Sequence, residues 1–275
     1  MTVEVLHPHG FCAGVTAALK KALSLAGRSN GAVYCLHELV HNQIVVEGLR
    51  AKGFVFVEDI AEIPPDATVL FSAHGVSPKV RELAVQHGLE IVDATCPFVT
   101  RVHKAARDFV QRGLPVVVLG HSGHAEARGI VGEIESLGGM CQCTADAQSV
   151  SFPDGAKIGV VSQTTMNADD VAFSVEKLRM RYDVETMAEV CNATKERQDA
   201  VKSFDGDAVL VLGSANSSNT RRLCEVARCR TFRAGTLDEV RALDLSSIDR
   251  LGVTSGASTP EDFFNEVISE LEKMP

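Results

Sequence analysis

The chain has 275 residues, of which 45% are hydrophobic, with no tryptophan and a formal net charge of −9. This charge argues against broad binding to nucleic acid or to membrane surfaces, and no apolar run approaches the roughly 18 residues that a membrane-spanning helix needs. The start of the chain lacks a basic segment followed by an apolar one, so no signal peptide is expected. We therefore expect a cytoplasmic protein whose eight cysteines are reduced, metal-bound or catalytic rather than paired in disulfides.

The N-terminal stretch introduces a pattern that returns twice along the chain. A short apolar run leads through a loop to Cys12, and apolar residues then recur at four-residue spacing, as on one face of a helix. The same succession of apolar run, cysteine and helical pattern appears at Cys96 and again at Cys191. Pro97 suits the first position of a helix. The repeat predicts three similar modules that each present one cysteine at a helix N-terminus.

A helix N-terminus lowers the pKa of a thiol, because the helix dipole and the free N–H groups favour the thiolate. A single free cysteine is most often a small buried hydrophobic residue. Three cysteines at equivalent positions of a repeat are better explained by a metal or cluster at a junction of the three modules.

Between these cysteines, short apolar and β-branched runs alternate with helical patterns, which predicts an α/β fold. Most of the runs are continuously apolar, as in parallel strands that are covered on both faces. Length alone suggests about two domains, but the repeat predicts three modules, at residues 13–96, 97–192 and 193–275, the last completed by residues 1–12. The predicted strands are 33–35, 54–57, 69–71, 116–119, 158–161, 209–212 and 251–253.

Loops rich in Gly, Ser, Thr, Asn and His follow the predicted strands. Ligands of open α/β sheets bind at the carboxyl ends of strands, and hydroxyl, amide and imidazole donors suit an anion there. His41, His74 and His124 lie in such loops, whereas His87 and His103 are expected on helix surfaces. Small polar residues also cap helices for structural reasons, but six such loops together favour a binding site.

Other sequence motifs are absent. The chain has no Gly-x-Gly-x-x-Gly after its first strand, no phosphate-binding P-loop and no Gly-x-Ser-x-Gly. The remaining cysteines lack the paired spacing of a structural zinc site, so we interpret them as structural or incidental: Cys35, Cys141, Cys143, Cys224 and Cys229.

With the loops assembled, the sequence closely resembles the 4-hydroxy-3-methylbut-2-enyl diphosphate reductase family over its whole length. The motifs that carry the resemblance stand in family order: Gly10-Phe-Cys-Ala-Gly-Val15, His37-Glu-x-Val-His-Asn42, Phe71-Ser-Ala-His-Gly-Val-Ser-Pro78, Asp93-Ala-Thr-Cys-Pro97, Ser162-Gln-Thr-Thr165, Cys191-x-Ala-Thr194, Asn216-Ser-Ser-Asn219 and Gly252-Val-Thr-x-Gly-Ala-Ser258.

The resemblance implies a trefoil of three α/β modules with pseudo-threefold symmetry around a central [4Fe–4S] cluster. The cluster would be held by Cys12, Cys96 and Cys191, with one iron open to substrate, and electrons would come from a donor such as ferredoxin or flavodoxin. Glu126 and Thr164 would lie by the hydroxyl of the substrate as proton source and relay. The allylic diphosphate would be bound by His41, His74, His124, Ser217, Ser218, Asn219 and Ser258. The reaction would be the reductive removal of that hydroxyl, the last step of the non-mevalonate isoprenoid pathway.

The chain departs from the family pattern at a few positions, none of them an implied ligand. His9 stands where the family usually has arginine, and Thr16-Ala17, Ala125 and Ala215 replace other common family residues. One alternative is therefore a divergent paralogue with another donor or a related substrate, and another is a cluster-containing sensor that binds a phosphorylated ligand without turnover. Retention of both Glu126 and Thr164 argues against the sensor, which needs no proton relay. A third alternative is a structural zinc trefoil.

Overall fold

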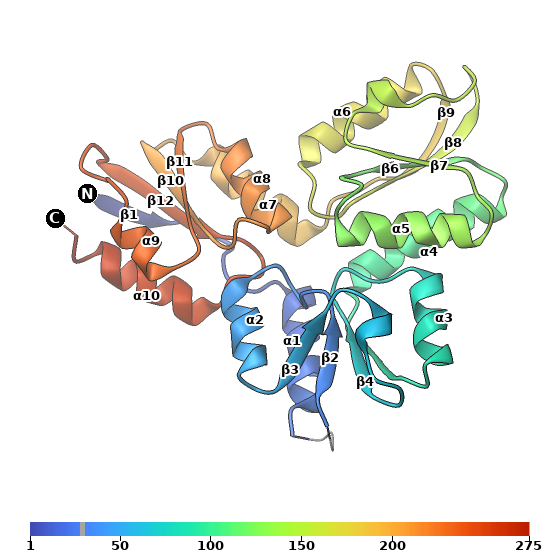
Figure 1. Cartoon of the computed structure of the whole chain (residues 1–275). Helices are drawn as coiled ribbons and strands as arrows, with labels where there is room; N and C mark the ends of the chain where they lie inside the picture. Colours follow the sequence, from blue (N-terminus) through green and yellow to red (C-terminus); the bar gives the residue numbers. More distant parts are fainter. Residues whose placement is uncertain (28–30, 275) are drawn as a thin grey trace. The chain divides into compact units, whose positions relative to one another are not determined.

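The computed structural model describes residues 1–27 and 31–274. The strands form three four-stranded sheets, and every strand pair is parallel. The fold is therefore α/β, with three parallel-sheet modules as predicted (Figure 1).

The first two sheets are each built from one region of the chain, whereas the third combines strands from both ends of the chain. The first has the order β3 (Phe54–Val57), β2 (Val33–Leu36), β4 (Thr68–Phe71), β5 (Glu90–Asp93). The second has the order β7 (Cys141–Thr144), β6 (Val116–Leu119), β8 (Lys157–Ser162), β9 (Asp183–Met187). The third has the order β1 (Thr2–Val5), β12 (Arg250–Ser255), β10 (Ala208–Leu212), β11 (Arg230–Ala234), so the N-terminal strand completes it.

Helices connect the strands, and their bounds are α1 (Ala13–Leu25), α2 (Gln43–Arg50), α3 (Pro78–Gln86), α4 (Pro97–Gln111), α5 (Ala125–Ser136), α6 (Ala168–Arg179), α7 (Asn192–Ser203), α8 (Ser218–Val226), α9 (Leu237–Arg241) and α10 (Glu261–Leu271). Short 3₁₀ turns lie at Ile60–Glu62 and Ala147–Ser149.

All seven strands expected from the sequence are present, and three of the central strands are buried along their whole length. β4, β6 and β10 have no residue outside the core, and their Val, Leu and Phe side chains pack against helices on the two faces. The strands that the sequence did not single out lie at sheet edges. β7, β9 and β11 are partly exposed and polar, because an edge strand has one neighbour and buries less of its surface.

The structure confirms that the three repeat cysteines stand at helix starts. α1 begins directly after Cys12, while Cys96 and Cys191 are the N-cap residues of α4 and α7. Gly27 and Gly113 follow the ends of α1 and α4 with left-handed φ angles of 82° and 77°. Glycine reaches this region without a steric penalty.

The chain divides into two compact units. The terminal unit comprises residues 1–16, 40–49 and 191–275 and contains the third sheet; the middle unit comprises residues 17–39 and 50–190 and contains the other two. The division passes through α1 and α2. It does not test the module boundaries proposed near residues 96 and 192, which stay predictions.

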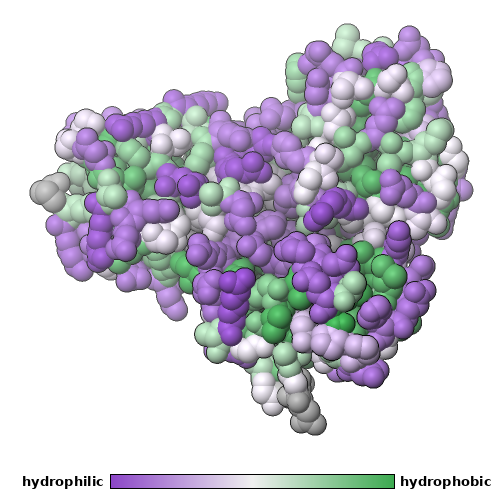
Figure 2. Space-filling view, in the orientation of Figure 1, coloured by the Kyte–Doolittle hydropathy of each residue, from purple (hydrophilic) through white to green (hydrophobic). Residues whose placement is uncertain are grey.

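No helix within residues 1–27 and 31–274 combines the length and the apolar character needed to cross a bilayer. The face drawn in Figure 2 is mostly hydrophilic, with apolar side chains in small groups between polar ones.

Candidate functional site

In each sheet, the loops that carry the predicted binding and catalytic residues follow the two central strands. In the second sheet, β6 connects outward to β7 and β8 connects outward to β9, so the chain leaves these adjacent central strands in opposite directions. The same holds for β2 and β4, whereas in the third sheet β10 connects outward to β11 and β12 leads into α10. Loops that diverge from neighbouring parallel strands leave a crevice at the carboxyl edge, where α/β proteins bind ligands. The predicted binding and catalytic residues each follow one of the six central strands, whereas the three predicted metal ligands follow the edge strands β1, β5 and β9.

In the middle unit, this topology brings Glu126 and Thr164 into contact. β6 and β8 end side by side, with Leu119 opposite Ser162, and the loops that follow them carry these two residues. The backbone N–H of Thr164 donates to Glu126 Oε1 at 2.7 Å, and its hydroxyl donates to Oε2 at 3.1 Å. Both side chains are buried, and Glu126 is only 1% exposed.

Burial raises the pKa of Glu126 to about 7, and the hydrogen bonds from Thr164 oppose that rise. The carboxyl therefore exchanges its proton near neutral pH, as a general acid should. A nearby diphosphate or anionic cluster would also cause such a rise. The protein interior produces it without either group, because a buried carboxylate loses its hydration.

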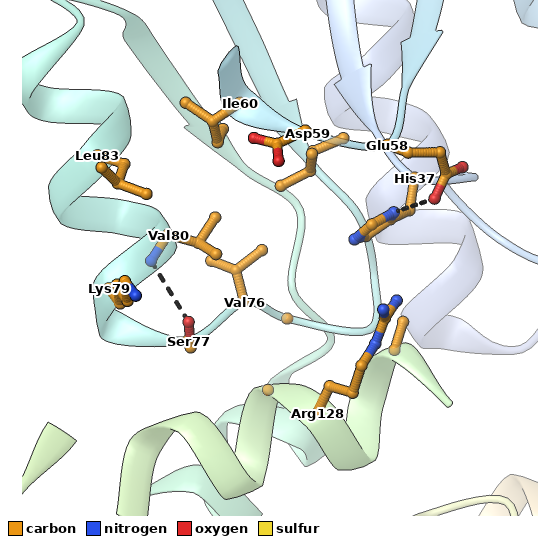
Figure 3. A pocket seen from close by; sticks show the side chains of 14 residues that line it. His37, Glu58, Asp59, Ile60, Val76, Ser77, Lys79, Val80, Leu83 and Arg128 are labelled. Carbon is orange, nitrogen blue, oxygen red and sulfur yellow. Dashed lines mark hydrogen bonds and ion pairs between the residues drawn. The ribbon is translucent and has the colours of Figure 1, made fainter. Parts of the chain in front are cut away.

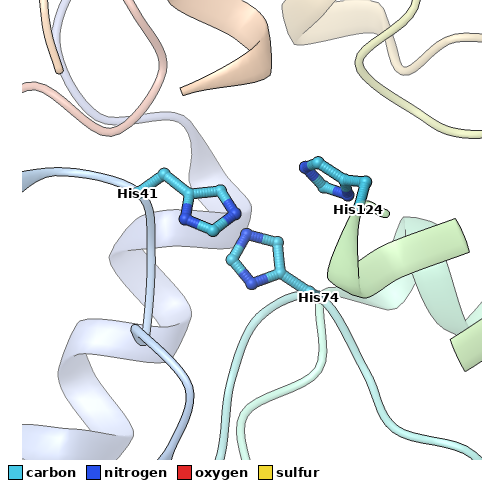
Figure 4. Close-up of side chains that lie close together, drawn as sticks. All are labelled: His41, His74 and His124. Carbon is cyan, nitrogen blue, oxygen red and sulfur yellow. The ribbon is translucent and has the colours of Figure 1, made fainter. Parts of the chain in front are cut away.

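Two predicted histidines lie close together in the same unit. The rings of His74 and His124 are 5.6 Å apart and nearly perpendicular (Figure 4). His124 caps α5, and its Nδ1 accepts a hydrogen bond from the backbone N–H of Glu126 at 3.2 Å. Since Nδ1 accepts, a neutral His124 carries its proton on Nε2 and can donate from there. His41, also drawn in Figure 4, belongs to the terminal unit.

The terminal unit holds the remaining predicted binding residues at the ends of β10 and β12. Ser217 caps α8, with its hydroxyl accepting from Thr220 N–H at 3.3 Å, and the next two residues begin that helix. The hydroxyl of Ser258 donates to the carbonyl oxygen of His41 at 3.1 Å, which ties the loop after β12 to the start of α2. Helix starts rich in hydroxyl and amide groups favour anions.

Asn219 stands out among these residues. It is 5% exposed, and within the described parts of the chain neither its amide nitrogen nor its amide oxygen has a hydrogen-bond partner. Buried polar groups are nearly always paired, so an orphaned amide at a strand-end crevice calls for an explanation. A bound polar ligand would supply the missing partner.

The eight cysteines, none of which is in a disulfide, fall into two groups. Burial raises the pKa of each of the five outside the repeat, to about 12 for Cys35 and about 11 for Cys143 and Cys224. These thiols stay protonated and are poor metal ligands. The three repeat cysteines stand at helix starts instead, and the side chains of Cys96 and Cys191 make no capping hydrogen bond to the helix backbone.

One residue of functional interest was missed by sequence reasoning. Arg197 lies on the buried face of α7, which also contains Thr194, Gln198 and Val201, and it is 2% exposed. Its guanidinium faces Cys12 and Cys191 of the same unit. The sequence did contain a signal for its burial: Arg197 stands three positions after Thr194 and four before Val201, which places a charged residue on the helix face that is expected to be apolar.

The expectation that His103 lies on a helix surface was wrong. Its side chain is buried, and its Nδ1 lies 3.2 Å from a carboxylate oxygen of Glu133. The imidazole packs against Gly75 and Gly129, where an added Cβ would lie 3.2 Å from its Nε2. His103 therefore separates the loop that carries His74 from α5, and glycine is needed on both sides of the ring. His87 ends α3 and is partly exposed.

A pocket of about 350 Å³ lies next to these loops in the middle unit (Figure 3). His37 Nδ1 and Glu58 Oε2 lie 2.8 Å apart in its lining, and the side chain of Arg128 on α5 extends toward the same side of the pocket. Among the described residues that line it, none is a predicted site residue. It is a neighbour of the site loops through Gly75 and Ala125 rather than the site itself.

Three parallel α/β modules, three helix-capping thiols and a buried proton donor are the set of groups that an iron–sulfur oxidoreductase uses. Within that class, the chain belongs to the LytB family, since the family model described as LytB protein matches residues 3–272.

Curated relatives support this assignment over nearly the full length. The chain is 41% identical to the 4-hydroxy-3-methylbut-2-enyl diphosphate reductase of Anaplasma marginale (strain St. Maries), covering 98% of this chain and 82% of that protein. It is 42% identical to the protein of that name from Azoarcus sp. (strain BH72), covering 99% and 90%.

Solved structures agree. The chain matches the E-1-hydroxy-2-methyl-but-2-enyl-4-diphosphate reductase from Plasmodium falciparum with a TM-score of 0.92 and 29% identity, covering 99% of this chain and 88% of that one. A second match, to a structure titled as (E)-4-hydroxy-3-methyl-but-2-enyl diphosphate reductase, the terminal enzyme of the non-mevalonate pathway, has a TM-score of 0.69 and 30% identity over the whole of both chains.

Proposed function

We propose that this chain is a 4-hydroxy-3-methylbut-2-enyl diphosphate reductase, an oxidoreductase that acts in the last step of the non-mevalonate isoprenoid pathway. It removes the allylic hydroxyl of its substrate as water, with two electrons and two protons, to give isopentenyl and dimethylallyl diphosphate. In a chain of this family, the observation that carries the proposal is the buried Glu126–Thr164 pair with a carboxyl pKa of about 7. A sensor or binding protein has no use for such a proton donor.

The family uses an iron–sulfur cluster. We assign it as a [4Fe–4S] cluster held by Cys12, Cys96 and Cys191, with one iron left open, and reduced by a donor such as ferredoxin or flavodoxin. The donor set fits: the three thiols are outside disulfides and cap helices, and a buried guanidinium faces two of them. When bound, the cluster supplies electrons and a Lewis-acidic iron for the substrate oxygen.

The diphosphate is assigned to the residues that the family resemblance implies: His41, His74, His124, Ser217, Ser218, Asn219 and Ser258. The Nε2–H of a neutral His124 is a donor, and hydrogen bonds from imidazole N–H groups to the anionic diphosphate are charge-assisted. The orphaned amide of Asn219 gains its partner from a phosphate oxygen.

Glu126 supplies the proton that makes the hydroxyl a leaving group. Neutral Glu126 holds its proton beside Thr164 Oγ1, 3.1 Å away. Thr164 gives its hydroxyl proton to the departing oxygen and takes the proton of Glu126 in the same movement, so water leaves and the carboxylate remains. The second proton goes to carbon, and the carbon that receives it determines which product forms.

Anaerobic turnover tests the proposal. Purified protein is given the allylic diphosphate and dithionite-reduced methyl viologen, and products are separated by chromatography. Formation of isopentenyl and dimethylallyl diphosphate is expected. Binding of the substrate without product would favour the sensor alternative, and zinc without iron or acid-labile sulfide would favour the structural zinc alternative.

Serine variants test the ligand assignment. Changing Cys12, Cys96 or Cys191 should remove the brown colour and the EPR signal of the reduced protein, because each supplies one ligand. The matched controls are the thiols whose pKa burial raises, such as Cys35 and Cys143, and their serine variants should keep the cluster. A full-strength cluster in Cys96→Ser would contradict the assignment.

A further inference from the structure

Arg197 connects two of the cysteine segments inside the terminal unit. Its Nη1 donates to the carbonyl oxygen of Ala193 at 2.8 Å, within the first turn after Cys191. Its Nη2 donates to the carbonyl oxygen of Gly10 at 2.8 Å and to that of His9 at 3.4 Å, in the loop that ends at Cys12. One planar side chain thus fastens the Cys12 loop to the helix that Cys191 caps.

The charge of this side chain is not balanced by an acid. Among residues 1–27 and 31–274, no carboxylate forms an ion pair with Arg197; the nearby groups that can carry a negative charge are the thiols of Cys12 and Cys191 and, more weakly, the exposed Glu196. Its Nε is buried and has no hydrogen-bond partner in that part of the chain. A guanidinium stays protonated in proteins, even though burial lowers the pKa of Arg197.

The neighbouring residues add no second positive charge. His9 stacks on Phe264 with ring centroids 3.9 Å apart, and burial lowers its pKa, which favours the neutral ring. Burying an unpaired cation costs free energy unless an anion or a set of dipoles compensates it. Three carbonyl oxygens accept hydrogen bonds from the guanidinium but carry no net charge, so the compensating charge must come from the thiolates and the group that they hold.

We propose that Arg197 is a positioning residue for the cluster, which holds the Cys12 loop against α7 and places a permanent positive charge beside the thiolates of Cys12 and Cys191. This inference rests on the cofactor of the proposed function. A positive charge in a low-dielectric site favours the state with one more electron. Arg197 therefore makes the cluster easier to reduce, in addition to ordering two of its ligands.

The test compares three variants by EPR-monitored redox titration of the anaerobic, substrate-free protein, with iron and sulfide measured on the same samples. Arg197→Gln removes the charge and keeps a hydrogen-bond donor, Arg197→Lys keeps the charge and loses the bridging geometry, and Arg241→Gln removes a charge from an exposed ion pair with Glu270. We expect Arg197→Gln to make reduction at least tenfold less favourable, which lowers the potential by about 59 mV for one electron. Arg197→Lys should stay closer to the wild type, and Arg241→Gln should match it.

A purely structural role would lower the cluster content of Arg197→Gln without moving the potential of the clusters that remain. An unchanged potential in that variant therefore overturns the proposal. If Arg197→Gln folds, by circular dichroism, but holds no cluster, Arg197→Lys decides: a full cluster near the wild-type potential supports the requirement for charge, and loss of the cluster there too refutes it. A wild-type protein without iron would instead refute the proposed function, and wild-type turnover is not needed for any of these readings.

Discussion

A buried polar group in each unit differs in whether its hydrogen bonds are satisfied: Glu126 has its partners, and Asn219 lacks them in the described chain. In the middle unit, Glu126 receives two hydrogen bonds from Thr164 and is buried with its partners in place. In the terminal unit, Asn219 is almost as buried, but within the described chain its amide has no partner at all. The carboxyl that we propose as the proton donor has its hydrogen bonds in place without a ligand, whereas the amide that we propose for binding does not.

This difference follows from what each group must do. A proton donor needs a fixed pKa and a fixed direction, and only the protein can supply both before the substrate binds. A binding group gains most when its hydrogen bonds form only with the ligand, because a bond that already exists must first be broken. The unsatisfied amide then lowers the stability of the substrate-free protein.

The largest effect is expected at the completed pair. Glu126→Gln keeps the size of the side chain and can still accept from Thr164 N–H, but it removes the transferable proton. We expect an intact cluster, near-normal substrate binding and a rate lower by about 10²–10⁴, the usual contribution of a general acid. Anaerobic turnover at matched iron content measures it. A rate within a few-fold of the wild type would remove Glu126 from the mechanism.

The same carboxyl should make the stability of the protein depend on pH. Its pKa is about 7 in the folded protein against a usual 4.5, so the folded state holds the proton more tightly than the unfolded state. The stabilisation is complete below about pH 4.5 and is lost as the pH rises through 7, by about 3 kcal/mol in total. Thermal unfolding from pH 5 to 8 should therefore show a decline for the wild type that Glu126→Gln lacks. Parallel curves for the two proteins would contradict a buried, titrating Glu126.

Much of the fold and of the placement of the candidate site could be predicted from the sequence. Continuous apolar runs such as 116–119 and 209–212 mark buried parallel strands, and the polar loops after them mark the carboxyl edge of each sheet. The repeat of apolar run, cysteine and helix predicted three N-cap thiols correctly. These features depend on local pattern and on the general topology of parallel sheets, which one sequence displays.

The features that were missed depend on tertiary contacts. The edge strand β7, Cys141–Thr144, is partly exposed along its length, so its sequence has no buried pattern to detect. His103 and Arg197 are polar residues on buried helix faces, where their partners come from Glu133, thirty residues away, and from the loop of Gly10, far away in sequence. The orphaned amide of Asn219 is likewise visible only when everything around it is known.

For the unpartnered amide of the terminal unit, we expect Asn219→Ala to weaken binding of the allylic diphosphate. A hydrogen bond to a charged group contributes about 1.5–3 kcal/mol, so the Kd for the allylic diphosphate should rise tenfold or more, and His41→Ala should have a similar effect. Isothermal titration with the unreduced protein measures it. Asn265→Ala, on the exposed face of α10, is the control and should bind normally. A monophosphate analogue that binds wild type as tightly as the diphosphate would contradict a clamp on two phosphates.

The smallest expected effects distinguish the two regions most directly, because their signs differ. Thr164→Val and Asn219→Leu each replace a buried polar side chain by an apolar one of similar shape. In Thr164→Val, an oxygen of Glu126 loses its partner, and we expect the substrate-free protein to lose about 1–2 kcal/mol of stability. In Asn219→Leu, an amide that has no partner in the described structure is removed, so stability should be unchanged or rise by up to about 1 kcal/mol. For a chain of this size each kcal/mol shifts the Tm by about 2–4 °C, which differential scanning calorimetry resolves at pH 6, where Glu126 is mostly protonated.

Substrate should then raise the Tm of Thr164→Val far more than that of Asn219→Leu, since only the first variant keeps the amide that we propose for binding. If both variants lost stability equally, Asn219 would be satisfied in the free protein, and its amide would not be held in reserve for the ligand.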